Sequence, residues 1–272
     1  MDDVKLLVEG IKERIENKYD FVAGITGEEG TGKSTFAIQL GMAFGNFDLE
    51  NNIVYLPKTQ ELRDKFRKIP EKGILIVDEA IKALYKQNWR EKVQTEINQL
   101  YATERWRNKV TLLLMPRFTD FNEFFRNHRI KFWFHILRRG IGIFLIKDDL
   151  NPFAPDPWYM KENFKIIYEH TKKFKNIYKV DIDSLLKVFE TKILNFVSSF
   201  TWDPLPEKIE QKYLELKAKS REIAEMEEVN VDKNLIIKKL YERGFTQKEI
   251  AEIAGITQPT VSYLLKKYGI DA

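Results

Sequence analysis

A glycine-rich stretch at residues 27–34 constrains this chain more than any other feature. It follows an apolar run at residues 21–25 and precedes helical spacing over residues 34–44. Its letters, Gly-Glu-Glu-Gly-Thr-Gly-Lys-Ser, match the Walker A pattern, in the strand-to-helix position that this pattern requires. Glycines allow consecutive backbone N–H groups to turn toward a polyphosphate, and the dipole of the following helix adds to the attraction. The alternative is a glycine-rich turn that merely precedes a Lys-Ser pair.

The expected nucleotide-binding residues are those of this loop and the position after it. Lys33 would hold the β- and γ-phosphates of ATP, and the Ser34 hydroxyl would ligate Mg²⁺. The full set is Gly27, Glu28, Glu29, Gly30, Thr31, Gly32, Lys33, Ser34 and Thr35.

A second, acidic element supports the first. Residues 74–77 are apolar at consecutive positions, as expected of a strand buried on both faces of a parallel sheet, and Asp78 and Glu79 follow. In this Walker B form, Asp78 would bind Mg²⁺ directly or through water, and Glu79 would act as general base or orient the attacking water. The alternative is a solvated helix start with Asp78 as its N-cap. The Asp-Glu pair resembles the hydrolytic ATPases of the additional-strand class, in contrast to small-molecule kinases.

Strand and helix patterns alternate through the first half of the chain. They predict an α/β fold of the RecA-like P-loop NTPase type with a mostly parallel sheet. Two further strands, at residues 131–137 and 141–147, flank Arg138-Arg139-Gly140 and predict a hairpin at the sheet edge. Helices are expected at residues 1–18, 34–44, 59–68 and 90–107, and the other strands at 21–25, 53–55, 74–77 and 110–115.

Two proline-rich breaks, at residues 151–157 and 203–206, divide the rest of the chain. Residues 160–200 have helical spacing without an interpretable motif. The linker that follows is highly charged, with a thin apolar stripe at Ile209, Tyr213, Leu216 and Ile223. We expect a P-loop ATPase domain at 1–150, a helical extension at 151–204, a linker helix at 205–230 and a small all-α domain at 231–272.

Composition excludes several classes of protein. The 272 residues include no cysteine, which excludes disulfide scaffolds, thiolate zinc sites and thiol nucleophiles. The N-terminus is acidic and shows no signal peptide, and the longest apolar runs are far shorter than the roughly 20 residues that cross a bilayer. We therefore expect a cytoplasmic protein without membrane contact. The formal net charge of +4 is too small to identify a nucleic-acid binder by itself.

The order of elements resembles the FtsK/HerA-type and zonular-occludens-toxin-like P-loop ATPases of viruses and plasmids. In that group the Walker B strand leads into a long helix ending in arginine, then to a strand with a polar sensor. Here Arg105 ends the expected helix, and Met115-Pro116-Arg117 stands where such proteins usually place a glutamine, so that Arg117 would contact the γ-phosphate instead. The resemblance implies an ATP site between subunits of a ring or filament, and a mobile-element or viral role in moving, packaging or remodelling DNA.

Basic residues concentrate between positions 105 and 139, where nine of them accompany two acids. Arg126 and Arg129 follow the expected sensor strand and are the candidates for an arginine finger that reaches a neighbouring subunit's nucleotide. Others would line a DNA channel and replace the counterions of its phosphates. The alternative for any one of these side chains is an ordinary solvated surface.

Residues 232–268 are similar to the helix-turn-helix family, with three short helices of which the first is expected at 233–242. Thr246 and Glu249 form a capping box for the second, and Gly255 turns the chain. In that family the third helix enters the major groove of double-stranded DNA. The alternative is a three-helix bundle used for protein contacts. The expected DNA contacts are Gln258, Thr260, Ser262, Tyr263, Lys266 and Lys267.

Together these features predict a DNA-associated, Mg-dependent ATP hydrolase that forms a homo-oligomer and is stimulated by DNA. Two alternatives stay open. One is an AAA+-like replication initiator or transposition regulator, and the other is an ATP-sensing transcription regulator.

Overall fold

The computed structural model describes residues 3–55, 59–80, 107–151, 156–171 and 181–267. Its contacts divide the chain into two units, Met1–Leu216 and Lys217–Ala272. The first unit therefore takes in the expected extension at 151–204 and the start of the expected linker helix. The expected helix at 90–107 and Arg105 lie outside the described residues.

Seven strands of the described residues form one sheet in the order β2-β3-β4-β1-β5-β6-β7. Neighbouring strands from β2 to β5 are parallel, whereas β6 is antiparallel to both β5 and β7. The expected α/β class with a mostly parallel sheet is therefore confirmed. The strands are β1 (Phe21–Thr26), β2 (Ile53–Val54), β3 (Ile74–Val77), β4 (Val110–Met115), β5 (Phe132–Arg138), β6 (Ile141–Ile146) and β7 (Phe196–Thr201).

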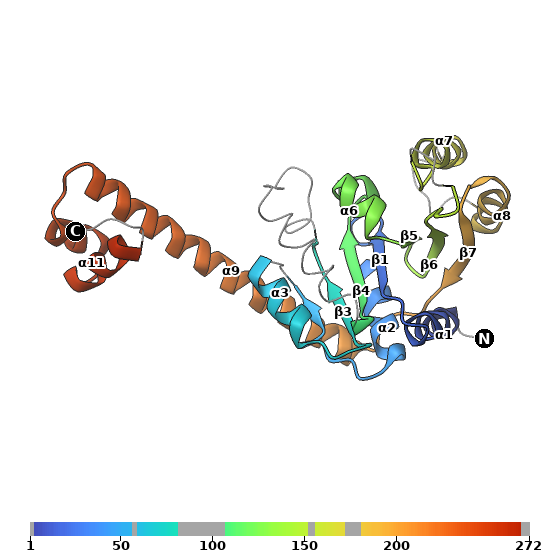
Figure 1. Cartoon of the computed structure of the whole chain (residues 1–272), viewed down its shortest axis with the longest axis horizontal. Helices are drawn as coiled ribbons and strands as arrows, with labels where there is room; N and C mark the ends of the chain where they lie inside the picture. The colour runs from blue at the N-terminus through green and yellow to red at the C-terminus, as the bar shows by residue number, and fades with distance from the viewer. Residues whose placement is uncertain (1–2, 56–58, 81–106, 152–155, 172–180, 268–272) are drawn as a thin grey trace. The chain divides into compact units, whose positions relative to one another are not determined.

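Helices of the first unit cover both faces of this sheet, with α1 and α2 on one side and α6, α7 and α8 on the other (Figure 1). The central strand β1 is buried at every position, as expected of a strand covered on both faces. The helices that the structure describes in this unit before α9 are α1 (Asp3–Glu16), α2 (Lys33–Phe44), α3 (Thr59–Lys68), the 3₁₀ turn η2 (Phe118–Asp120), α6 (Glu123–His128), α7 (Met160–Thr171) and α8 (Ile182–Lys192).

The hairpin of β5 and β6 is confirmed, but its expected place at the sheet edge is wrong. The outer neighbour of β6 is β7, with Phe144 opposite Ser198. Strand β7 begins within residues 160–200, whose spacing predicts helices. Its burial nevertheless alternates, since Phe200 is 2% exposed and Val197 is 48% exposed. That period of two is typical of a strand with one covered face.

The expected break between the linker helix and the helix at 233–242 is also wrong. One helix, α9, runs over Glu207–Glu242. The sequence contains no glycine or proline between these two positions, so nothing local ends the helix. Its first turns belong to the first unit, where Ile209, Tyr213 and Leu216 pack against the same core as α1 and α2.

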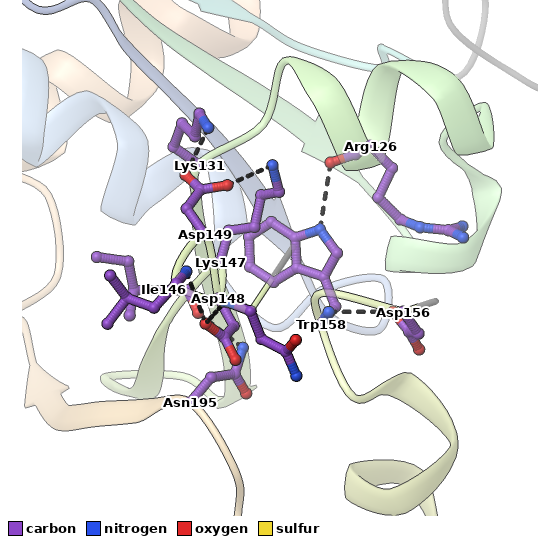
Figure 2. A network of polar contacts seen from close by, with 11 residues as sticks. Arg126, Lys131, Ile146, Lys147, Asp148, Asp149, Asp156, Trp158 and Asn195 are labelled. Atoms are coloured by element: carbon purple, nitrogen blue, oxygen red, sulfur yellow. Dashed lines mark hydrogen bonds and ion pairs between the residues drawn. The ribbon is translucent and has the colours of Figure 1, made fainter. Parts of the chain in front are cut away.

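A group of ion pairs, which we call the Asp149 network, lies at the start of β5 and the end of β6 (Figure 2). Asp149 binds the ammonium groups of Lys131 at 2.5 Å and Lys147 at 2.6 Å. Nearby, the Trp158 indole N–H donates to the carbonyl oxygen of Arg126 at 3.2 Å. These contacts fasten the connection after β6 to the sheet and to α6.

Candidate nucleotide-binding site

The loop at residues 27–34 begins directly after β1 and leads into α2, so the strand–loop–helix position expected of it is confirmed. Gly27, Gly30 and Gly32 have φ values of 150°, 75° and 94°. Side chains other than glycine rarely adopt these values. A Cβ atom on Gly27 would also lie 2.7 Å from the Ile136 carbonyl oxygen of β5. The loop therefore needs glycine for both its curvature and its close approach to the sheet.

The lysine of the loop folds back over it. Lys33 Nζ donates to the carbonyl oxygens of Gly27 at 2.7 Å and Glu28 at 2.8 Å. The Thr31 hydroxyl donates to the same Glu28 oxygen at 2.8 Å. The lysine ammonium thus lies in the loop at the N-terminal end of α2. Its charge and the positive end of the helix dipole both favour an anion there. Glu28, Glu29 and Gly30 are exposed, whereas Gly32, Lys33, Ser34 and Thr35 are half-buried.

The two sequence motifs meet in space. Ser34 Oγ lies 3.5 Å from Asp78 Oδ1, although 44 positions separate these residues. The carboxylate of Asp78 follows β3 and is 4% exposed. Because β1 and β3 belong to the same parallel set, both carboxyl ends lie at one end of the sheet, and this places the serine hydroxyl beside the aspartate.

Glu79 has an unusual backbone conformation. Its φ is 49°, in the left-handed region that glutamate rarely adopts. Its N–H donates to Asp78 Oδ1 at 3.0 Å. A hydrogen bond to the neighbouring carboxylate thus accompanies the turn, and strained backbone of this kind concentrates at functional sites.

A hydrogen-bonded group that sequence reasoning missed lies at the root of the loop. The Trp133 indole N–H donates to Thr26 Oγ1 at 2.7 Å, and Thr26 Oγ1 lies 2.8 Å from His135 Nδ1. The hydroxyl accepts from the indole and also carries a proton of its own, which we assign to the bond with His135. In this assignment the imidazole proton lies on Nε2. Burial, together with the smaller effect of the positive charge of Lys33, lowers the pKa of His135 to about 4. The imidazole is therefore neutral at pH 7.

The β5–β6 turn and the end of β7 brace the loop from outside. Arg139 Nε donates to the carbonyl oxygen of Gly30 at 3.0 Å. A Cβ atom on Gly32 would lie 3.6 Å from the ring of Trp202, and the backbone N–H of Trp202 donates to the Gly140 carbonyl oxygen. The sequence places Arg139 in a basic region but contains no signal for this contact, which depends on how the hairpin folds back.

The predicted finger residues lie away from this loop within one chain. Arg126 and Arg129 are half-buried and belong to α6 or follow it. Lys131, just after Arg129, donates its N–H to Val22 near the start of β1. This places both arginines near the end of the sheet opposite the loop. Arg117 is exposed and lies at the loop end, since the neighbouring Pro116 oxygen accepts from the Gly27 N–H.

In the second unit, the end of α9 is followed by α10 (Gln247–Ala254) and α11 (Gln258–Lys267) (Figure 1). The predicted capping box is confirmed: the Glu249 N–H donates to Thr246 Oγ1, and the Thr246 N–H donates to the glutamate carboxylate. Gly255 ends α10 in the left-handed conformation, with φ 64°. A small core holds the three helices together, and its buried members are Ile237, Ile250, Ala251, Val261 and Leu265.

The predicted DNA-contacting residues lie on α11, away from that core. Tyr263 is 67% exposed, and Ser262 is half-buried. The other exposed members of the set are Gln258, Thr260, Lys266 and Lys267.

The donors of the first unit suit a magnesium–triphosphate better than a metal held by protein alone. Within the described ranges, no group of three or more His, Cys, Asp or Glu side chains is arranged to hold a metal ion. Mg²⁺ characteristically takes one or two protein oxygens and completes its shell with substrate phosphates and water. Ser34 and Asp78 offer that pair of oxygens, and Lys33 offers the charge that phosphates require.

Among the helices in the described parts of the chain, none is long and apolar enough to cross a membrane.

Comparison with known proteins assigns this chain to no family. The sequence matches no family model and no curated protein. One similar solved structure is a replication initiator DnaA bound to AMPPCP and single-stranded DNA, with 17% sequence identity and a TM-score of 0.30. The likeness covers 96% of this chain and 86% of that one. At that TM-score it carries no conclusion about fold or function, so the α/β assignment follows from the sheet topology and the site from the residues themselves.

Proposed function

We propose that the first unit binds Mg-ATP between the loop at 27–34 and Asp78, and that it hydrolyses ATP. The observation that carries this proposal is the 3.5 Å approach of Ser34 Oγ to Asp78 Oδ1. A glycine-rich turn without function has no need of a buried carboxylate beside it. A helix start with Asp78 as N-cap would leave the serine contact unexplained.

Each group of the site has a distinct task in this proposal. Lys33 would exchange its loop carbonyls for phosphate oxygens, and Ser34 with Asp78 would hold the metal ion. When bound, Mg²⁺ neutralises phosphate charge. Glu79, held in a strained turn beside Asp78, would orient or deprotonate the attacking water.

The proposal includes a homo-oligomer in which an arginine of one subunit reaches the nucleotide of the next. Arg126 and Arg129 remain the candidates, and their distance from the loop of their own chain agrees with action on a neighbour. The helix α11 would contact double-stranded DNA through its exposed polar face. Several copies in one assembly would add their weak individual affinities.

The biological role proposed is movement, packaging or remodelling of DNA in a virus or mobile element. The alternatives, a replication initiator, a transposition regulator and an ATP-sensing transcription regulator, share the same nucleotide site and differ in what DNA does to turnover. Strong stimulation by any duplex would support a motor, whereas dependence on one sequence would support an initiator or regulator.

The experiment is phosphate release by the full chain, measured without DNA, with random duplex and with single strands. We expect hydrolysis without any acceptor substrate and faster hydrolysis with duplex. The variants Tyr263→Ala and Lys266→Ala, at exposed positions, should lower the DNA stimulation and leave the rate without DNA unchanged. A rate without DNA that depended on an added acceptor would instead indicate a kinase.

A further inference from the structure

The side chain of Tyr213 reaches the proposed metal site from a helix that sequence reasoning treats as a linker. Its hydroxyl donates to Asp78 Oδ2 at 2.6 Å, across 135 positions of sequence. The other carboxylate oxygen, Oδ1, faces Ser34 and accepts from the Glu79 N–H. The two oxygens of Asp78 therefore have different partners: the Tyr213 hydroxyl on Oδ2, and the Ser34 hydroxyl and the Glu79 N–H on Oδ1.

Tyr213 is itself held firmly. It is 7% exposed, and its ring lies 5.7 Å from the ring of Tyr55, tilted by 37°. Leu205 and Leu216, on either side of it in sequence, pack against the same core. The Tyr55 hydroxyl points to a different partner, since it donates to the Leu49 carbonyl oxygen at 3.0 Å. The packing of the Tyr213 ring therefore ties its contact with Asp78 to the position of the start of α9.

A hydrogen bond of this kind controls the direction of a carboxylate. Bonds from a hydroxyl to an ionised carboxylate are short and about twice as strong as neutral ones, and 2.6 Å lies within their usual range. Without the Tyr213 hydroxyl, Oδ2 of Asp78 would lose this hydrogen bond in a buried position, which costs free energy. Rotation of the carboxylate toward other donors would reduce that free-energy cost. The same rotation would turn Oδ1 away from Ser34. Partners of this type around metal ligands typically change metal affinity by about 10- to 100-fold.

We infer that Tyr213 is a positioning residue for Asp78 and that the first turns of α9 complete the magnesium site. This inference rests on the proposed function, because it assumes that Asp78 holds Mg²⁺. Tyr213 does not touch nucleotide or metal in this account. It acts by keeping one oxygen of Asp78 occupied and the other directed toward Ser34.

The test is the Mg²⁺ dependence of nucleotide binding in full-length wild type, Tyr213→Phe and Tyr55→Phe. Binding of a fluorescent ATP analogue is titrated with Mg²⁺ and repeated in EDTA, with circular dichroism melts to confirm folding. We expect Tyr213→Phe to need about 10- to 100-fold more Mg²⁺ for the same binding and to match wild type in EDTA. Tyr55→Phe removes a neighbouring buried hydroxyl that does not contact Asp78, and it should keep the Mg²⁺ dependence of wild type.

A second comparison separates a direct effect from a general loosening. In the background of Asp78→Asn, adding Tyr213→Phe should change the Mg²⁺ dependence little, because the carboxylate it positions is gone. An unchanged Mg²⁺ dependence in folded Tyr213→Phe, or an equal change in Tyr55→Phe, would overturn the inference and leave the proposed function standing. A wild-type chain that binds no nucleotide at any Mg²⁺ concentration would overturn both.

Discussion

Two polar groups at opposite ends of β5 use charge differently. In the Asp149 network, Lys131 and Lys147 both pair with Asp149, and these ion pairs join the loop after β6 to the start of β5 (Figure 2). At the other end, Lys33 donates to two carbonyl oxygens of its own loop. Asp78 accepts from the Tyr213 phenol, the Glu79 N–H and the Ser34 hydroxyl. The contacts of the first group are ion pairs, whereas those just named for Lys33 and Asp78 are hydrogen bonds with neutral groups.

The difference separates structural from ligand-binding polarity. An ion pair that satisfies both of its members gives a ligand nothing to gain, and an exposed pair adds little stability, typically below about 1 kcal/mol. An ammonium group can exchange a hydrogen bond to a neutral carbonyl oxygen for a stronger one to a charged phosphate oxygen. The four predictions that follow test this contrast.

The largest expected effect is that of Glu79→Gln on turnover. Loss of a general base typically slows a reaction by about 100- to 10,000-fold, whereas an amide of the same shape leaves the loop and Asp78 in place. We expect ATP binding close to wild type and almost no phosphate release. Glu123→Gln, at an exposed position of α6, serves as the control and should hydrolyse ATP normally. Loss of binding in Glu79→Gln would instead assign the residue a structural role.

Acid should weaken the first unit through His135. The folded-state pKa of about 4 lies below the ordinary value of 6.5, so protonation favours the unfolded chain. The contribution is complete above pH 6.5 and is lost as the pH falls toward 4. The total loss is at most about 3 kcal/mol.

The measurement is urea unfolding at pH 7, 6, 5 and 4.5. His135→Asn keeps an acceptor for the Thr26 hydroxyl and should flatten the dependence of stability on pH. His128→Asn, at an exposed position of α6, should retain that dependence. Equal pH dependence in wild type and His135→Asn would refute this assignment.

Two glycines of the loop should differ in their tolerance of alanine. Gly27→Ala meets both an unfavourable φ and the Ile136 oxygen, and we expect a loss of about 1–3 kcal/mol in the free energy of unfolding together with weaker nucleotide binding. Gly30→Ala meets no atom within 4 Å and should cost only the left-handed conformation, about 1 kcal/mol. Thermal melts compare the two, and an equal cost would contradict the close approach of Gly27 to β5.

The smallest expected effect is that of Asp149→Asn. Burial alone would raise the pKa of Asp149, yet hydrogen bonds from Lys131 and Lys147 lower it, so the carboxylate is charged in the folded protein. Because Asp149 is 49% exposed, removing its charge should cost no more than about 1 kcal/mol. Thermal melts should show this small loss, with ATP binding and hydrolysis unchanged. A clear loss of nucleotide binding would mean that the two polar groups are not independent.

Local patterns sufficed for the parts of the site that are contiguous in sequence. The loop at 27–34 and the acids after β3 have residue types that their own backbone demands, and parallel strands bring the ends of β1 and β3 to one end of the sheet. The meeting of Ser34 and Asp78 was therefore predictable without knowledge of the strand order.

The rest of the site depends on pairings that local patterns do not specify. Tyr213 has the spacing of an apolar stripe on a charged helix, and nothing in that stripe indicates a carboxylate partner. His135 reads as an isolated histidine until β5 is placed beside β1, opposite Thr26. The sequence patterns do not predict β7, because its six residues follow directly on helical patterns.

The most direct test of the central claim is the affinity of the full chain for ATP in the presence of Mg²⁺, measured by titration calorimetry in wild type and in Lys33→Ala. Loss of a hydrogen bond from a charged group typically costs about 1.5–3 kcal/mol, and we therefore expect binding by wild type and roughly 10- to 100-fold weaker binding by the variant. Equal affinities in the two proteins, or a folded wild type that binds no ATP, would contradict the account.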